Sequence, residues 1–304
     1  MTWILYRWTW RVASPLFIGT TPSGALNRCR VYVPTRPLWG AITAELARLE
    51  GDKDPQYRQV GEVLREQARF SYLYPAERAG DDWRAWIPEY REGAGLVWAR
   101  EDSDVAVAGR RFCRALLWTR PGTAIDPDND SALDGSLRET ECVQTHWRHG
   151  DGSHGSAVGL VGYVFLRDGA DVGDRLSTLG TLFIGGDTRY GLGRLERVAM
   201  APANTFFGAT VALHLVEPHV LAHRALGHAL VDNRAPMCGE QEAIGGWDMT
   251  GHEQGPRISG PVWTPGSRVL AADAPPRFQI DEHGLWQLRE DYPSESLSNG
   301  ASSS

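Results

Sequence analysis

The residue types best suited to binding chemistry gather in one short segment, residues 184–194, whose sequence is IGGDTRYGLGR. The segment contains four glycines and two arginines, namely Gly185, Gly186, Gly191, Gly193, Arg189 and Arg194. Glycine adopts positive φ and leaves backbone N–H groups accessible, while a guanidinium group binds phosphate through paired hydrogen bonds. We therefore expect this loop to hold a nucleic-acid backbone.

Two glycine-rich nucleotide loops do not fit the segment. The Rossmann fingerprint needs GxGxxG between a strand and a helix, whereas these glycines follow a predicted helix and lead into a predicted strand. The P-loop needs a Gly-Lys-Ser/Thr sequence, which is missing here. A nucleotide-binding enzyme of unrelated fold stays a further hypothesis, and it rests on the glycines alone.

The charge of the chain is segregated toward its start. The 304 residues carry a net charge of −7, yet residues 1–40 contain no Asp or Glu and carry +5, so the remainder carries −12. The five basic residues are Arg7, Arg11, Arg28, Arg30 and Arg36. Because phosphate contacts need local positive potential, we expect all five to contribute to RNA binding.

Aromatic side chains offer a second means of holding RNA, since stacking an unstacked base on a ring contributes about 1–3 kcal/mol. Trp39 lies beside the basic stretch and is the candidate for stacking, with packing in the core as the alternative. Trp8 and Trp10 share the predicted core face of a strand, so we expect them to pack inside.

The elements that must position these residues follow from periodicity. Apolar residues at the even positions of residues 4–12 predict a half-buried strand, with Arg7 and Arg11 together on its other face. Residues 14–33 are rich in Gly, Pro, Ser and Thr, which predicts a long excursion. Thr35 as N-cap, apolar residues at helical spacing and a stop at Gly51 predict the first helix.

Gly40 lies inside this predicted helix and lowers its helix propensity. Two explanations stay open, a close approach of backbone to a neighbour or to RNA, and simple packing against the sheet.

The remaining periodicities complete an α+β fold. We predict a second helix over residues 56–70, a strand over 157–166, a short helix over 171–183 and a strand over 195–200. With one further strand between residues 110 and 150, the order is βαββαβ, a ferredoxin-like (RRM-like) core. The predicted domains are residues 1–203 with an insertion at about 52–150, a smaller degenerate α+β half at 204–290, and a disordered tail at 291–304.

In the second half we predict strands near residues 210–216, 268–271 and 278–288. His219, His223 and His228 are expected to occupy positions on a helix.

Other classes of protein are disfavoured by what the chain lacks. No run approaches the roughly 20 apolar residues of a membrane span, and no leader pattern is present, so we expect a soluble, cytoplasmic protein. The four cysteines form no CxxC pair, so we expect free thiols and no cofactor. Cys142, His146, His149, Asp151 and His154 could supply three zinc ligands, but no second pair matches, and ordinary loop residues are the preferred interpretation.

Four segments together resemble one known family. The run GGDTRYGLGR is similar to the glycine-rich loop of RAMP superfamily proteins, which precedes the last strand of their ferredoxin-like domain. Residues 14–48 resemble the excursion and first helix of these proteins. Residues 122–143 resemble a hairpin that in the family often projects onto guide RNA, and residues 244–273 resemble segments of the larger type III CRISPR subunits.

This resemblance implies a non-catalytic RNA-binding subunit of a type III CRISPR effector complex, closest to the (Cas5-like) group that caps the 5′ handle of guide RNA. Its implied partners are guide RNA, the large subunit and the backbone subunits. A backbone (Cas7-like) subunit is one alternative, although it would need a cleaving aspartate in the excursion, and residues 1–40 contain none. A His-dependent guide-processing endoribonuclease is the other. Trp247 and Gly266-Ser267 favour the capping group.

Overall fold

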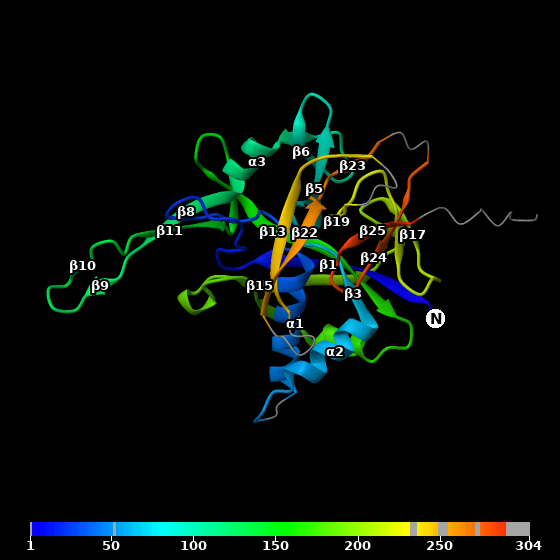
Figure 1. The fold of residues 1–304 in the computed structure, drawn as a ribbon, viewed down its shortest axis with the longest axis horizontal. Helices are drawn as coiled ribbons and strands as arrows, with labels where there is room; N and C mark the ends of the chain where they lie inside the picture. The colour runs from blue at the N-terminus through cyan, green and yellow to red at the C-terminus, as the bar shows by residue number, and fades with distance from the viewer. Residues whose placement is uncertain (1, 51–52, 232–235, 249–254, 271–273, 290–304) are drawn as a thin grey trace, which may run out of the picture.

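The computed structural model describes residues 2–50, 53–231, 236–248, 255–270 and 274–289. Its central strand is β1 (Trp3–Val12), which pairs antiparallel with β13 (His154–Arg167) on one side and β15 (Arg194–Pro202) on the other (Figure 1). Both partners are strands that the sequence predicts, and β13 is apolar along most of its length because it is buried on both faces.

The core order is β15–β1–β13–β4, antiparallel at each pairing, where β4 is Tyr74–Ala79. Helix α1 (Thr35–Leu49) follows β1, and α4 (Val172–Thr178) follows β13. This is the order of a βαββαβ unit, and the predicted α+β class is confirmed. The second core strand is β4, however, rather than a strand between residues 110 and 150.

The insertion extends the same sheet beyond β4. Strands β5 (Asp82–Arg91), β6 (Gly95–Arg100) and β7 (Ala106–Ala108) follow in order, and β3 (Ala68–Phe70) and β12 (His146–Arg148) also pair with β13. At the opposite end, β14 (Thr181–Phe183) pairs with β15. Helix α3 (Gly109–Leu116) leads from β7 into a projecting hairpin.

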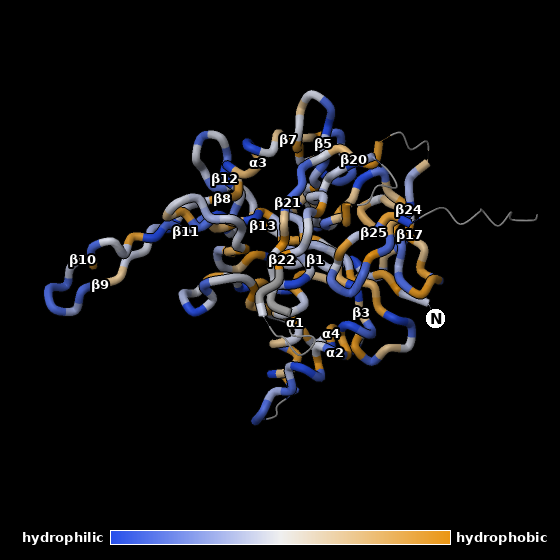
Figure 2. Tube along the Cα trace, viewed as in Figure 1, coloured by the Kyte–Doolittle hydropathy of each residue, from blue (hydrophilic) through white to orange (hydrophobic). Residues whose placement is uncertain are grey.

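The projecting hairpin is formed by β8 (Leu117–Gly122) and β11 (Arg138–Val143). It extends away from the body and ends in a smaller pair, β9 (Ile125–Asp126) with β10 (Ser131–Ala132) (Figure 1). Figure 2 shows mostly hydrophilic residues at this end. Residues 122–143, whose sequence resembles a projecting hairpin, therefore form one.

The N-cap of helix α1 lies one residue before the predicted one, so the helix begins at Thr35 itself. Pro34 is the N-cap, and the Thr35 hydroxyl instead donates to the Phe70 carbonyl at 2.8 Å. Gly40 has open space around it, so no close approach of another described segment explains it, and an approach to RNA stays a hypothesis. The tight contact is at Gly61 of α2 (Tyr57–Gln67), where a Cβ would lie 2.7 Å from the Trp39 ring.

Helices α1, α2 and α4 lie together on one side of the molecule (Figures 1 and 2). None of the helices in the described ranges is long and apolar enough to cross a membrane.

The second half of the chain builds another sheet. Its strands, in sheet order, are β16 (Thr205–Phe206), β17 (Ala209–Ala212), β18 (His219–Leu221), β24 (Arg277–Ile280), β25 (Trp286–Arg289), β19 (Ala229–Leu230), β22 (Gly255–Trp263) and β21 (Gln241–Asp248). A further pair joins β20 (Met237–Cys238) to β23 (Arg268–Val269). Of the predicted strands, the one near residues 210–216 forms as β17 and ends earlier, and the one near 268–271 forms as β23. The segment predicted as one strand near 278–288 is a hairpin of two strands, β24 and β25.

The helix predicted around the histidines is wrong. His219 begins β18, and His228 ends the loop that directly precedes β19. The described part of residues 204–290 contains strands and no helix. The boundary near residue 203 falls between the two large sheets and stays a prediction, and residues 290–304 lie outside the described residues.

The face assignment of β1 is only partly right. Trp8 and Trp10 are buried as predicted, but Ile4 is 38% exposed, and Trp3 and Leu5 on the opposite face are buried. The second half covers that face, since the Trp3 amide donates to the Leu213 carbonyl at 2.7 Å. When a strand is covered on both faces, its buried and exposed residues no longer alternate in a simple way.

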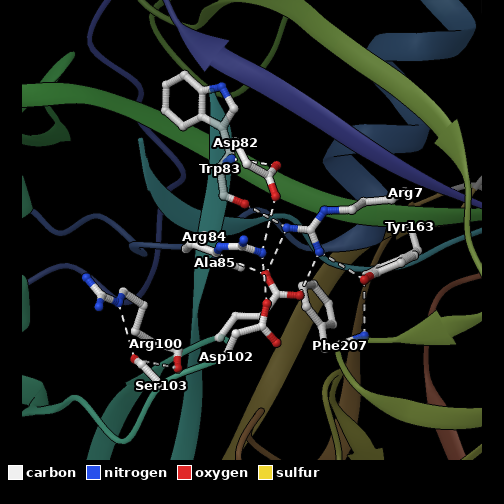
Figure 3. Close-up of polar contacts among 11 residues, drawn as sticks. Arg7, Asp82, Trp83, Arg84, Ala85, Arg100, Asp102, Ser103, Tyr163 and Phe207 are labelled. Atoms are coloured by element: carbon white, nitrogen blue, oxygen red, sulfur yellow. Dashed lines mark hydrogen bonds and ion pairs between the residues drawn. The ribbon is translucent and has the colours of Figure 1, made fainter. Parts of the chain in front are cut away.

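The coverage of β1 on both faces also explains the position of Arg7. Its guanidinium group donates to both carboxylate oxygens of Glu101 at 2.7 and 2.8 Å, to the Trp83 carbonyl at 2.8 Å and to the Tyr163 hydroxyl at 3.0 Å (Figure 3). The side chains of Arg7 and Glu101 are only 21% and 11% exposed. Arg7 therefore joins β1 to the inserted strands.

We expect Glu101→Ala to lower the free energy of unfolding by about 2–3 kcal/mol, because it leaves the mostly buried Arg7 charge without its partner. Glu62→Ala is the matched control, since its pair with Arg58 is exposed, and it should change stability by less than about 0.5 kcal/mol. Urea denaturation measures both, and equal effects would contradict the role given to Arg7.

Candidate nucleic-acid interface

The glycine-rich loop is packed against the excursion that follows β1. Gly185 and Gly193 have φ of 87° and 80°, which few other residues adopt. A Cβ at Gly185 would lie 2.2 Å from the Phe17 carbonyl oxygen, and one at Gly193 would lie 2.0 Å from that of Ile184. Both positions therefore require glycine for close backbone packing as well as for conformation.

Hydrogen bonds join the same two segments. The Gly186 amide donates to the Phe17 carbonyl at 2.9 Å, and the Gly193 amide donates to the Pro15 carbonyl at 2.8 Å. The Arg194 amide donates to the Ser14 hydroxyl at 2.9 Å. These amides are used internally, so an anion at this loop would meet its arginine side chains rather than a cradle of free glycine amides.

The projecting hairpin meets both segments at its base. Strand β11 pairs in parallel with β2 (Leu26–Asn27) of the excursion. Arg138, the first residue of β11, lies over the Tyr190 ring, with its guanidinium carbon 5.0 Å from the centroid. Tyr190 belongs to the short 3-10 turn η1 (Thr188–Tyr190) of the glycine-rich loop and is 65% exposed. Three segments distant in sequence thus form one surface.

Six exposed arginines from β1 and these segments define what we call the arginine surface: Arg11, Arg28, Arg120, Arg138, Arg189 and Arg194. Arg11 and Arg194 both pair with Glu196, the latter at 3.0 Å, so one carboxylate compensates two charges. Arg28, Arg120, Arg138 and Arg189 have no ion pair within the described residues. The surface carries excess positive charge on a chain that is acidic overall.

Charge on the hairpin itself is graded. Between Leu117 and Val143 the only basic residues are Arg120 and Arg138, both at the base. The tip carries four aspartates, Asp126, Asp128, Asp130 and Asp134. Glu139 and Glu141 on β11 offset these two arginines, so strands β8 and β11 carry no net charge, whereas the tip is negative. Phosphate would therefore be repelled from the tip, and positive potential at the base depends on the arginines of the adjoining loops.

Arg120, Arg138 and Tyr190 were not singled out by the sequence pattern. Arg120 and Arg138 lie within the hairpin segment, whose resemblance was the available signal, and Tyr190 lies inside the glycine-rich run. Their pairing could not be foreseen, because about fifty residues separate Arg138 from Tyr190. A second exposed aromatic ring, Trp118 on β8, is 53% exposed and lies beneath the Arg148 guanidinium at 5.0 Å.

Four predicted residues, Arg7, Arg30, Arg36 and Trp39, lie away from the arginine surface. Arg7 is inside the sheet, as described above. Trp39 packs between α1 and α2 with Arg65 over its ring at 4.6 Å, on the side of the molecule that carries the helices. Arg36, in the first turn of α1, is exposed beside Gly246 of β21.

Arg30 belongs to a buried polar network that links the two halves. Its guanidinium group donates to Glu242 at 2.6 and 2.7 Å and to the Tyr32 hydroxyl at 3.1 Å. His228 Nε2 lies 2.7 Å from Glu242, and His228 Nδ1 lies 2.5 Å from the Tyr72 hydroxyl. A neutral imidazole donating from Nε2 and accepting at Nδ1 satisfies both contacts.

The pKa shifts agree with this arrangement. Burial lowers the pKa of His228 below its usual value, despite the neighbouring Glu242 carboxylate. Burial alone would raise the pKa of Glu242, but hydrogen bonds from His228 and Arg30 lower it to about 2. The network therefore holds a neutral histidine beside a paired carboxylate and guanidinium group.

The candidate zinc residues do not form a site. Among the described residues, no group of three or more His, Cys, Asp or Glu side chains is placed to hold a metal ion. Cys142 is buried, with its thiol 3.8 Å from the Thr140 carbonyl. His146 and His154 face each other across β12 and β13 with ring centroids 6.2 Å apart.

Comparison with known proteins identifies the fold. No protein-family model and no curated protein matches the sequence. A chain in the cryo-EM structure of the Type III-B Cmr-beta bound to cognate target RNA and AMPPnP has a TM-score of 0.50 and 12% identity, covering 86% of this chain and 85% of that one. A chain in the structure bound to cognate target RNA has a TM-score of 0.40, covering 64% of this chain. The first of these shows a shared fold.

We expect Gly193→Ala to cost more than about 2 kcal/mol of stability, since its Cβ would meet the Ile184 carbonyl oxygen in addition to the strain of positive φ. Gly191→Ala is the matched control, because Gly191 has φ of 83° but open space, and it should cost about 1 kcal/mol. Thermal denaturation compares the two. Equal losses would show that the contact does not constrain the loop.

Stability should also fall as pH is lowered from about 7 to 5. The pKa of His228 is lowered by burial, and burial with nearby arginines lowers that of His219 to about 4, so both stay neutral in the folded protein. The unfolded chain takes up these protons near pH 6.5, so stability is lost as pH falls below that value, by about 1 kcal/mol at pH 5 for the half-buried His219. Glu242 loses its contribution only below its unfolded pKa of about 4.5.

Urea denaturation at pH 7.5 and 5.0 measures this effect. His219→Gln should flatten the dependence, whereas His154→Gln, an exposed control, should leave it unchanged. A stability that does not change between these pH values would contradict the neutral state assigned to His219 and His228.

Proposed function

We propose that this chain is an RNA-binding subunit of a type III CRISPR antiviral ribonucleoprotein, and that its arginine surface holds the repeat-derived 5′ handle of guide RNA. The observation that carries the proposal is the meeting of the excursion, the hairpin base and the glycine-rich loop. Four arginines there are free of ion pairs within the described residues. Guanidinium groups bind phosphate oxygens in pairs, and free ones need not break an internal contact first.

The surface suits single-stranded RNA in particular. Tyr190 offers an exposed ring whose other side is covered by Arg138, so a base can stack where a phosphate is bound nearby. Splayed bases stacked on aromatic rings are the usual basis of sequence-specific RNA recognition. Trp118 provides a second exposed ring at the hairpin base and replaces Trp39 as the stacking candidate.

The shared fold supports the same assignment. The similar chain of the Type III-B Cmr-beta comes from a structure bound to cognate target RNA. The acidic remainder of this chain suits contacts with protein neighbours, which we propose are the large subunit and the backbone subunits. A cytoplasmic location follows from this role. We propose a non-catalytic subunit, because the excursion holds no aspartate to cleave RNA.

Replacing Arg138 and Arg189 together with alanine should weaken binding of repeat-derived RNA at least about tenfold. It should also reduce the slope of log affinity against log salt by roughly 1.4, since each lost phosphate contact on a single strand contributes about 0.7. Filter binding at several salt concentrations measures both quantities.

The matched control replaces Arg58 and Arg78, which are exposed arginines outside the arginine surface, and should leave affinity unchanged. A scrambled RNA of equal length separates handle recognition from general attraction to phosphate. Unaltered affinity and salt slope in the Arg138 and Arg189 double variant would overturn the proposal.

A further inference from the structure

A cleft of about 560 Å³ lies between the two halves of the protein. The excursion forms one wall, the first turn of α1 forms the end, and the hairpin of β21 and β22 forms the other wall. Its volume falls in the range of small-ligand sites, which is about 300–1,000 Å³. The cleft is separate from the arginine surface, although Ile18 lines the cleft and also contacts Gly185 of the glycine-rich loop.

The cleft is positively charged. Arg30 and Arg36 line it, and its lining includes no acidic residue. Arg36 has no hydrogen bond or ion pair within the described residues, and its guanidinium group rests against the backbone of β21. A Cβ at Gly246 would lie 2.2 Å from Arg36 Nη1, so glycine at that position leaves room for the guanidinium group.

The first turn of α1 adds to the positive potential. Its N-cap is Pro34, no side chain caps the turn, and it holds no acidic residue. Pro34 and Arg36 both line the cleft, so the positive end of a 15-residue helix opens into it. Helix N-termini attract phosphate groups, here beside an unpaired guanidinium group.

The walls are apolar and suited to a flat ring. Ile18 comes from the excursion, and Ile244 and Ile258 come from the hairpin. Ile258 is 77% exposed, so its side chain is accessible to a ligand at the rim of the cleft. Thr20 and Ser259 add hydroxyl groups that can bond to ring edges or sugar.

The floor of the cleft is held rigidly. Arg30 and Tyr72 line it, and both belong to the network with Glu242 and His228. Since Glu242 already compensates Arg30, the uncompensated charge in the cleft is that of Arg36. A pre-organised floor lowers the entropy lost when a ligand binds.

We propose that this cleft holds one unstacked nucleotide, with its phosphate at Arg36 and the first turn of α1 and its base against Ile244 and Ile258. The inference deepens the proposed function, on which it rests when the nucleotide belongs to the bound RNA. A free mononucleotide carries the same phosphate and base, and it is the other source from which the cleft could be filled.

Two variants test the cleft without disturbing the core. Arg36→Ala removes the phosphate ligand, and Ile258→Asp places a negative charge on the apolar wall at an exposed position. Arg58→Ala is the control for loss of an exposed arginine. Calorimetry with AMP, GMP, CMP and UMP tests the free nucleotide, and repeat-derived RNA carrying 2-aminopurine at single positions tests a nucleotide of the strand.

If free nucleotides occupy the cleft, at least one monophosphate binds, and both variants weaken it at least about tenfold. If the RNA supplies the nucleotide, one 2-aminopurine position shows a fluorescence change on binding that both variants remove. Absence of both signals, or signals that survive in both variants, would overturn the inference. The Arg138 and Arg189 double variant should leave monophosphate binding intact, so failure of the arginine surface and failure of the cleft are distinguishable.

Discussion

The burial of the central sheet on both faces is the constraint on which the rest of this structure depends. Strand β1 is covered by helices on one face and by the second half of the chain on the other, where Arg7 is held by Glu101. A charged side chain in that position has to be paired internally, since a lone buried charge is very costly. The arginines of the arginine surface that have no ion pair among the described residues therefore lie on loops and on the projecting hairpin.

Those loops are held together by backbone contacts rather than by side-chain packing alone. Gly185 and Gly193 allow the glycine-rich loop to lie directly on the excursion, and β2 pairs with β11 of the hairpin. Because backbone hydrogen bonds fix the three segments relative to one another, their exposed arginines can be placed without being buried. Binding groups on loops that a rigid scaffold positions are a common arrangement.

The distribution of charge agrees with this placement of the exposed arginines. The net charge is −7, yet four arginines at the hairpin base and the adjoining loops have no ion pair within the described part of the chain. The hairpin tip is acidic, so its surface is unsuited to phosphate. The two halves of the protein meet at a different place, where Arg30, Glu242 and His228 form a network beneath a second positive region around Arg36. The proposed RNA-binding surface and the contact between the two halves thus share the excursion.

The sequence by itself determined the local elements. The strands at β1, β13 and β15, the helix α1 and the excursion between them follow from periodicity and from glycine and proline positions, which are local properties of the chain. The glycine-rich loop and the acid-free start were visible in the same way. These features define the α+β class and the segments that carry the candidate site.

Only the tertiary structure decided which residues are free to act. Arg7, Arg28 and Arg30 look alike in the sequence, but Glu101 and Glu242, distant in the chain, pair with the first and the third. The strand content of the second half, the stacking of Arg138 on Tyr190 and the cleft beside Arg36 also depend on long-range contacts. Pairing and burial are properties of positions in space, and a periodic pattern along one chain does not contain them.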